Sequence, residues 1–281
     1  RTDSLAMSAA PAVLAFEVPL VSPVLSTAPV DPAVADSLIR FARECPGATM
    51  LDFGCGTGHL GQEIRAAGLD VAGADVYYGG SKTRAEAEQS GLLGVAIREI
   101  RDGRLDFADS SFDLVVNNQV MEHVADLDAA LREIHRVLKP DGTVLSIFPS
   151  RDVFREGHIG IPFAHWFPSG SRLRFYYTWA LRCLGLGTWK QEAPTRRQWA
   201  ADKLRWIDEH THYRPRREIF AAFGRYFESR HRESDYIRYR LLDRPGRGAL
   251  AALAGLPVVS AAARAGFRQL GFMVIVSRRA A

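Results

Sequence analysis

Short apolar runs alternate with amphipathic segments over residues 40–150, and this pattern predicts an α/β fold. The runs at 48–51, 71–74, 111–118 and 143–148 have strand length and are apolar through most of their positions. The segments at 59–67 and 131–138 carry apolar residues at helical spacing, and Lys139-Pro140-Asp141-Gly142 predicts the end of the second. Strands that alternate with helices form a mostly parallel sheet.

The first predicted strand runs into Leu-Asp-Phe-Gly-Cys-Gly-Thr-Gly, at residues 51–58. Glycines at alternate positions let a ligand lie against bare backbone, although a tight turn that binds nothing is an alternative reading of this loop alone. The next apolar run ends in Asp75, 17 positions after Gly58. An acid at the end of the second strand is expected to accept hydrogen bonds from ribose hydroxyls, which favours a nucleotide-type ligand.

Residues 40–150 resemble a class I S-adenosylmethionine-dependent methyltransferase of the broad small-molecule type. The matching pieces, in order, are 51–58, Asp75, 105–113, Val120-Met-Glu-His-Val124 and Arg136-Val-Leu-Lys-Pro-Asp-Gly142. Asp106 and Asp141 depart from the usual proline and glycine, but both lie outside the expected cofactor contacts. The resemblance implies a Rossmann-like doubly wound sheet of seven strands, mostly parallel with the last antiparallel, carrying helical cap insertions.

The same resemblance implies a cofactor site. The loop of Gly54, Cys55, Gly56 and Gly58 would follow the methionine part, with Cys55 present as a small side chain. Asp52 would help to hold the amino group, and Asp75 would bind the ribose. Asp102 is the candidate for the adenine amine, although a solvated loop acid is an alternative. Asn118 and Gln119 would face the sulfonium and the substrate.

Charge and aromatic residues divide the chain of 281 residues into two unlike halves. Residues 1–150 hold 12 basic and 21 acidic residues, whereas residues 151–281 hold 24 and 11. All five tryptophans lie in the second half. This split predicts that the basic half meets an anionic partner, such as a phosphorylated or lipid-linked small molecule, a membrane surface or RNA.

Four segments are expected. Residues 1–35 form an N-terminal arm or lid, interrupted by prolines that also argue against a signal peptide. Residues 36–150 form the cofactor-binding core, and 151–225 form a basic, aromatic cap inserted after the fifth strand. Residues 226–281 hold a sixth strand near 226–231, a helical insertion and a seventh strand at 271–277.

Histidines near the strand ends are the candidates for proton transfer. His158 follows the fifth strand, where ligands lie in open α/β sheets, and its pKa near neutrality suits a general base. His165 and His123 are the alternatives, while a structural hydrogen bond is the more frequent role of such a residue. His210 and His212 are expected on the cap surface, farther from the motifs. Glu122-His123 lacks a spaced third ligand, so no metal site is predicted.

Two segments bear on membrane contact. Residues 172–186 are basic and aromatic, which fits an interfacial helix or, more simply, a cap helix packed on the core. Residues 248–263 carry no charge, but they are too short for a span and are interrupted by Pro257. A buried helical hairpin or peripheral contact is therefore favoured over a transmembrane helix. Three separated cysteines without metal spacing suit a cytoplasmic protein, with peripheral attachment at the inner face of a membrane as an option.

The sequence thus leads to one main function and two alternatives. The main one is methyl transfer from S-adenosylmethionine to a small-molecule or glycan- or lipid-precursor acceptor, with a hydroxyl favoured. RNA methylation is an alternative prompted by the basic half, but the chain has no recognisable RNA-binding module. A cofactor-binding regulator that does not methylate is the third, and the intact glycine loop argues against it.

Overall fold

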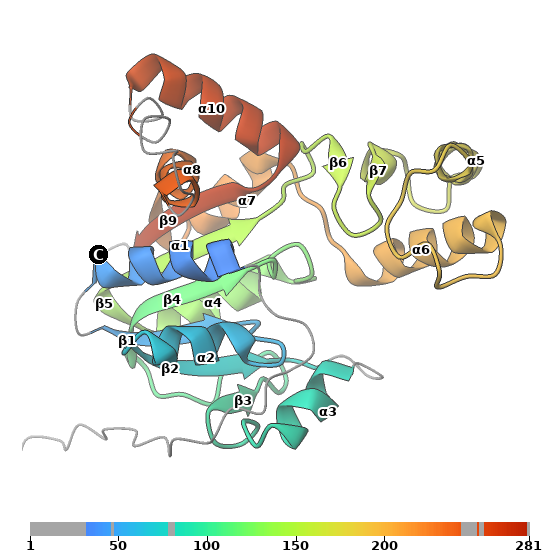
Figure 1. Cartoon of the computed structure of the whole chain (residues 1–281). Helices are drawn as coiled ribbons and strands as arrows, with labels where there is room; N and C mark the ends of the chain where they lie inside the picture. The colour runs from blue at the N-terminus through green and yellow to red at the C-terminus, as the bar shows by residue number, and fades with distance from the viewer. Residues whose placement is uncertain (1–31, 46–47, 78–81, 243–251, 253–255, 280–281) are drawn as a thin grey trace, which may run out of the picture.

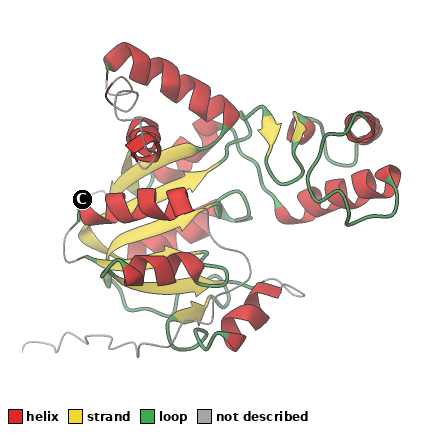
Figure 2. Cartoon of the chain, viewed as in Figure 1, coloured by secondary structure: helices red, strands yellow, loops and turns green. Residues whose placement is uncertain are grey.

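The centre of the computed structural model is a seven-stranded sheet (Figures 1 and 2), and the described residues are 32–45, 48–77, 82–242, 252 and 256–279. The strands, in spatial order, are β3 (Ile97–Glu99), β2 (Asp70–Asp75), β1 (Thr49–Phe53), β4 (Phe112–Asn118), β5 (Leu138–Phe148), β9 (Met273–Arg279) and β8 (Phe227–His231). β9 runs antiparallel to both of its neighbours, and the other pairings are parallel. The predicted sheet is confirmed.

Helices cover both faces of the sheet (Figure 1). One face is covered by α1 (Pro32–Arg43), α2 (His59–Ala66), α8 (Glu233–Leu242) and α10 (Pro257–Leu270), and the other by α4 (Leu127–Val137) and α7 (Arg216–Phe223). α3 (Lys82–Gln89) lies beside the β3 edge. In α4 the apolar residues Leu127, Leu131 and Ile134 fall on one stripe and are buried, as an amphipathic helix requires. Asp126 caps this helix by accepting a hydrogen bond from Ala129 N at 3.0 Å.

Helix α4 ends at Val137, as Lys139-Pro140-Asp141-Gly142 predicted, but the start of the fifth strand differs from the prediction. β5 begins at Leu138, directly after the helix, rather than at residue 143. The pairing of β4 with β5 is irregular between Phe112 and Leu114. Phe112 pairs with Leu138 of β5, and Leu114 pairs with Thr143. The residues of β5 between these two pairings form a bulge.

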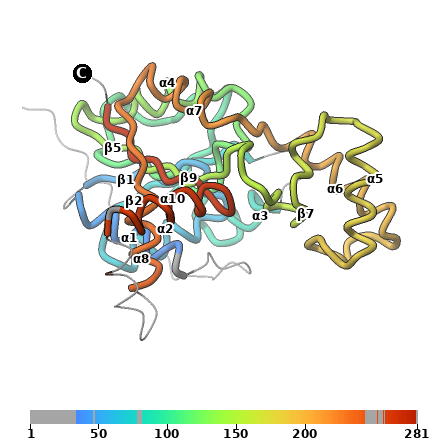
Figure 3. The backbone as a smooth tube through the Cα atoms, turned by 90° about the horizontal axis from the view of Figure 1, so that it is seen from above, coloured from blue at the N-terminus to red at the C-terminus, as the bar shows by residue number. Residues whose placement is uncertain are grey.

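Residues 151–215 form a separate lobe beside the sheet, the cap (Figures 1 and 3). It contains β6 (Arg155–Glu156), β7 (Ile161–Pro162), a 3₁₀ turn (Ala164–Trp166), α5 (Arg172–Cys183) and α6 (Arg196–His210). Trp199 is buried in a small apolar core of the cap, with Ile159, Ile161 and Leu204. An ion pair between Arg174 and Asp208 joins α5 to α6. Helix α5 packs its aromatic residues within the cap rather than on the core sheet.

The cap is tied to the core at its base. Arg151 N donates to Arg214 O at 2.8 Å, and Phe154 N donates to Gln269 O at 2.7 Å. Helix α7 packs in the core cluster through Ile219 and Phe223, so the lobe that stands apart ends near residue 215, before the expected 225. Most of the expected arm, residues 1–31, lies outside the described residues.

The C-terminal apolar segment is partly described. Residues 243–251 and 253–255 lie outside the described part, and with them most of the first half of the hairpin expected over 248–263. The second half begins α10. This helix packs against α8, while Val258 is 82% exposed and Leu270 is 72% exposed. Within the described ranges, the helices are too short or too polar to cross a membrane.

Candidate functional site

The glycine loop links β1 to α2 at the carboxyl end of the sheet. Gly54 and Gly58 have φ angles of 78° and 85°, in the left-handed region that favours glycine. A Cβ on Gly54 would lie 2.4 Å from a methyl group of Val120, so the loop after β4 packs directly on the glycine loop. A Cβ on Gly58 would lie 2.7 Å from Ile97. Close packing therefore requires glycine at both positions.

Gly56 differs from its neighbours, because the space beside it is open. Its φ is 55°, and a Cβ there would meet nothing within 4 Å in the described residues. Its amide donates to Asp75 Oδ2 at 2.8 Å, and Tyr77 Oη donates to its carbonyl at 3.0 Å. Tyr77 N donates to Asp75 Oδ1 at 3.0 Å. The end of β2 thus fixes a bare stretch of backbone that borders free space.

Asp52 is buried on β1, and one of its oxygens lacks a partner. The residue is 2% exposed, and Oδ2 makes no hydrogen bond in the described structure. Burial, and next the charge of Asp75, raise the pKa of Asp52 to about 7. A buried carboxyl oxygen without a partner costs free energy until a donor or cation meets it. This fits an ammonium group, bound directly or through water.

Cys55 has a packing role in the same loop. A Cβ built on Gly73 of β2 would lie 2.8 Å from Cys55 Sγ, so the thiol fills the space that this glycine leaves. Burial, and next the nearby Asp52, raise the pKa of Cys55, so the thiol is neutral. A neutral, packed thiol is a poor nucleophile.

The remaining cofactor candidates lie at two strand ends. Asn118 ends β4, and Gln119 follows with a φ of 58° and an amide that donates to Ile147 O at 2.7 Å. Asp102 is exposed in the turn after β3 with a φ of 52°. That turn borders a cavity of about 790 Å³, whose lining includes Arg84, Arg98, Glu99, Arg101 and Arg104. Asp102 thus stays a candidate for the adenine amine, beside the turn residues Arg101 and Arg104 that line the cavity.

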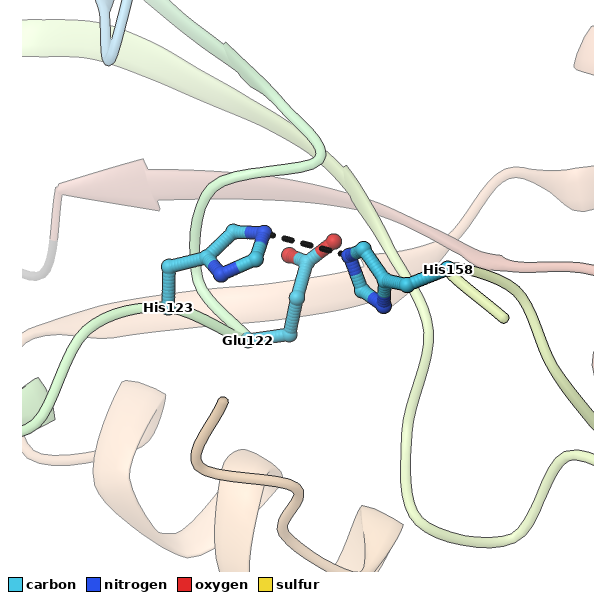
Figure 4. Close-up of side chains that lie close together, drawn as sticks. All are labelled: Glu122, His123 and His158. Carbon is cyan, nitrogen blue, oxygen red and sulfur yellow. Dashed lines mark hydrogen bonds between the residues drawn. The ribbon is translucent and has the colours of Figure 1, made fainter. Parts of the chain in front are cut away.

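The structure brings His123 and His158 together from opposite sides of the core–cap junction (Figure 4). His123 follows β4 in the core, His158 follows β6 in the cap, and their Nε2 atoms are 3.3 Å apart. His123 Nδ1 is 2.6 Å from His210 O, and a carbonyl only accepts, so Nδ1 carries the proton. Two of the three predicted candidates are therefore neighbours.

Glu156 holds the ring of His158 in place. It is 0% exposed, and its Oε1 is 2.7 Å from His158 Nδ1 and accepts from Tyr213 Oη at 2.6 Å. Burial is the largest influence and opposes ionisation of both Glu156 and His158, but their hydrogen bond, their mutual attraction and the smaller contributions of neighbours together outweigh it, so the pKa of Glu156 is lowered and that of His158 is raised. Burial, with smaller contributions from neighbours, lowers the pKa of His123. No pattern in the sequence pointed to Glu156 or Tyr213.

Glu122 completes this cluster (Figure 4). It is 1% exposed, and neither carboxyl oxygen has a hydrogen-bond partner in the described structure. Burial raises the pKa of Glu122 to about 8. Its carboxyl group points toward the two rings, and ligand atoms of Glu122, His123 and His158 lie within 4.8 Å of one another.

The structure places the other three histidines of the sequence analysis outside the pair. His165 is buried within the cap, where its Nε2 lies 3.1 Å from Arg151 O and its ring centroid 4.7 Å from that of Tyr213. It does not join the pair. His210 and His212 were expected far from the motifs, but the prediction was wrong. His210 supplies the carbonyl that holds His123, and His212 N donates to Glu122 O at 2.6 Å.

Residues 51–146 match the family model described as "Methyltransferase domain". The chain contains a class I S-adenosylmethionine-dependent methyltransferase domain. The match spans the glycine loop, Asp75, the β4 loop with Glu122 and His123, and most of β5. The cap lies outside it.

Relatives of known name are similar to part of the chain. The ubiquinone biosynthesis O-methyltransferase of Ruegeria pomeroyi is 42% identical over 101 residues, which are 36% of this chain and 40% of the relative. That of Cereibacter sphaeroides is 36% identical over 129 residues, or 44% and 52%. The chain thus spans about half the length of these relatives.

A solved structure is also similar to the chain. An S-adenosylmethionine-dependent methyltransferase from Mesorhizobium loti has a TM-score of 0.48 and 19% identity, covering 83% of this chain and 91% of the other.

Proposed function

We propose that this protein transfers the methyl group of S-adenosylmethionine to a hydroxyl of a small molecule that binds where the cap meets the core. The observation that carries the proposal is the packing of Val120 on Gly54. This contact places the loop with Glu122 and His123 directly against the cofactor loop. The candidate proton acceptors therefore lie beside the end of the cofactor that carries the reactive methyl group.

The cofactor assignment follows the geometry of the loop. The open space beside Gly56 takes the ligand backbone, and Asp52 faces the ammonium group with its unpartnered oxygen. Asp75 already accepts two amide hydrogen bonds, and a carboxylate has about four acceptor positions, so two remain for the ribose hydroxyls. Asn118 and Gln119 lie at the strand end that faces the sulfonium. S-adenosylmethionine supplies the electrophilic methyl group.

The histidine pair is suited to receive one proton. With His158 neutral, its Nδ1–H donates to Glu156, and both Nε2 atoms carry lone pairs 3.3 Å apart. As the acceptor oxygen bonds to the methyl carbon, the carbon–sulfur bond breaks and its electron pair stays on sulfur. The hydroxyl proton passes to His158 and is shared with His123, while Glu156 stabilises the imidazolium. Such a base contributes roughly 10²–10⁴-fold in rate.

The acceptor class is narrowed by the relatives and by the cap. The relatives named above are O-methyltransferases of ubiquinone biosynthesis, which supports a hydroxyl on a small molecule. Residues 151–215 hold 11 basic and 6 acidic residues, and Leu173 and Leu184 of the cap are 67% and 76% exposed. These features support an anionic or lipid-linked acceptor presented at a membrane surface.

Two measurements test this function. Calorimetric titration should show binding of S-adenosylmethionine, and incubation with methyl-labelled cofactor and a panel of phenols, catechols and polyprenylated phenols should label a hydroxyl. His158→Gln should lower kcat at least tenfold and leave cofactor affinity within threefold. Failure of the wild-type protein to bind the cofactor would refute the proposal. Labelling of RNA instead of the small molecules would favour the alternative function, RNA methylation.

A further inference from the structure

The cluster of Glu122, His123 and His158 has an arrangement that a shared proton does not fully explain. Both histidines engage Nδ1 with an acceptor, His123 with the His210 carbonyl and His158 with the Glu156 carboxylate. Metal-bound histidines characteristically do this, because the outer hydrogen bond fixes the ring and leaves the Nε2 lone pair for the ion. The two Nε2 atoms then face each other at 3.3 Å.

That separation suits two ligands of one ion. With metal–nitrogen bonds of about 2.1 Å, two nitrogens at a tetrahedral centre lie roughly 3.4 Å apart. The third group, Glu122, is buried with both oxygens unpartnered in the described structure and aimed at the rings (Figure 4). Its ligand atom lies within 4.8 Å of the others, so a small side-chain movement completes the set.

Charge points the same way. Glu122 and Glu156 are 1% and 0% exposed, so two carboxyl groups are buried within one cluster. Burying a charge is costly unless it is paired or coordinates a metal. Two carboxylates and two neutral imidazoles around one dication have zero net charge, whereas a single protonated histidine would leave one negative charge or a protonated acid.

We propose that Glu122, His123 and His158 form a binding site for one divalent transition-metal ion of the zinc type, assembled only when the cap meets the core. Imidazole and carboxylate ligands suit such an ion, and three protein ligands leave at least one position for another oxygen. The inference deepens the proposed function. Binding of the ion does not depend on that function, whereas a use of the ion in methyl transfer rests on it. In that function the open position would take the acceptor hydroxyl and lower its pKa. Both Nε2 atoms would then bind the ion and could not accept the proton, so the ion would replace the histidine pair as the activating group and the proton would leave to solvent.

The site is tested on the untagged full-length protein without any turnover. After treatment with a chelator and its removal, Zn²⁺ is titrated calorimetrically, and Co²⁺ is titrated with visible absorption as the readout. We expect one equivalent to bind at micromolar or lower Kd, with Co²⁺ bands typical of four- or five-coordinate nitrogen and oxygen ligands. Glu122→Gln, His123→Gln and His158→Gln should each weaken Zn²⁺ at least tenfold. His165→Gln, a buried cap histidine outside the cluster, should leave affinity within threefold.

The possible results distinguish failure of the metal site from failure of the proposed function. No stoichiometric binding to the folded wild-type protein, checked by circular dichroism, would overturn the site and leave the histidines as a proton-sharing pair. Zn²⁺ affinity equal to that of the wild type in all three variants would also overturn it. Metal binding without S-adenosylmethionine binding would support the site and refute the proposed function. Cofactor binding and methyl transfer that a chelator does not affect would support the proposed function and refute a role of the ion in it.

Discussion

Asp75 Oδ2 accepts a hydrogen bond from Gly56 N at 2.8 Å, and this contact joins the end of β2 to the glycine loop after β1. The acid expected to bind a ribose therefore also orients the backbone along which the cofactor is proposed to lie. Two strands that are neighbours in the sheet cooperate in one site, because their carboxyl ends meet at the same edge.

Replacing Asp75 should weaken cofactor binding through both roles. Asp75→Ala removes the ribose acceptor and releases the Gly56 amide, and charge-assisted hydrogen bonds contribute roughly 1.5–3 kcal/mol each. We expect the Kd for S-adenosylmethionine to rise at least tenfold by calorimetry. Asp70→Ala, at the opposite end of the same strand, is the control and should change Kd by less than twofold. Equal Kd values for the two variants would contradict the assignment of Asp75.

Gly56 offers a test of the open space beside it. Gly56→Ala should cost about 1 kcal/mol of stability, because its φ of 55° is unfavourable for a side chain, and should abolish cofactor binding by filling the ligand's place. Gly68→Ala is a matched control, since Gly68 has a φ of 82° and a Cβ there also meets nothing within 4 Å in the described residues. Both variants should lose similar stability in urea, but only the first should lose binding. Retained binding in Gly56→Ala would place the cofactor elsewhere.

Asp52 should make stability fall as pH rises. Burial raises its pKa from 3.8 to about 7, so the folded protein holds a proton that the unfolded chain releases at lower pH. The favourable contribution is complete below pH 3.8 and lost as pH rises to about 7. Asp52→Asn removes this dependence and should stabilise the unliganded protein above pH 7, by on the order of 2–4 kcal/mol.

The measurement is the difference in free energy of urea unfolding between the two proteins from pH 5 to 8. S-adenosylmethionine provides the second readout, because the neutral amide of the Asp52→Asn variant cannot neutralise an ammonium group, and binding should weaken at pH 8. A pH-independent difference would show that folding does not raise the pKa of Asp52. Unchanged cofactor affinity would show that Asp52 does not face the ligand.

An internal ion pair near the last strand should matter for stability and not for the site. Arg268 of α10 binds both oxygens of Glu233, at 2.9 and 3.0 Å, and Glu233 is 0% exposed. Burial opposes ionisation, but His231 and Arg268 hold the pKa of Glu233 to about 2. Arg268→Ala leaves His231 as the remaining ionic partner of this buried charge, and removal of one partner of a buried pair costs roughly 3–5 kcal/mol.

Urea unfolding at pH 7 measures this loss, with Arg264→Ala, one turn earlier on α10, as the control. Cofactor affinity of the folded Arg268→Ala protein should stay within twofold of the wild type. A loss below about 1 kcal/mol would mean that solvent reaches Glu233 and replaces the arginine.

Local pattern was sufficient to predict most of the core. The apolar runs located β1, β2, β4 and most of β5, and the sixth and seventh strands, expected near 226–231 and 271–277, are β8 and β9, whereas no apolar run pointed to β3. β5 begins at Leu138, earlier than the run at 143–148 predicts, and Pro140 and Gly142 lie in the irregular stretch between its pairings with Phe112 and Leu114. Proline and glycine are weak evidence against a strand that begins at a bulge.

The sequence by itself was enough to predict the methyltransferase domain and its glycine loop, because these depend on residues close together in the chain whose backbone conformation is local. Only the tertiary structure decided the cluster at the core–cap junction. His158 lies 35 residues from His123, and Tyr213 lies 57 residues from Glu156. Glu122 and His123 lacked a third partner in the sequence, and folding of the cap brings His158 to them. No period or spacing encodes such a contact, since it depends on how two separately packed lobes meet.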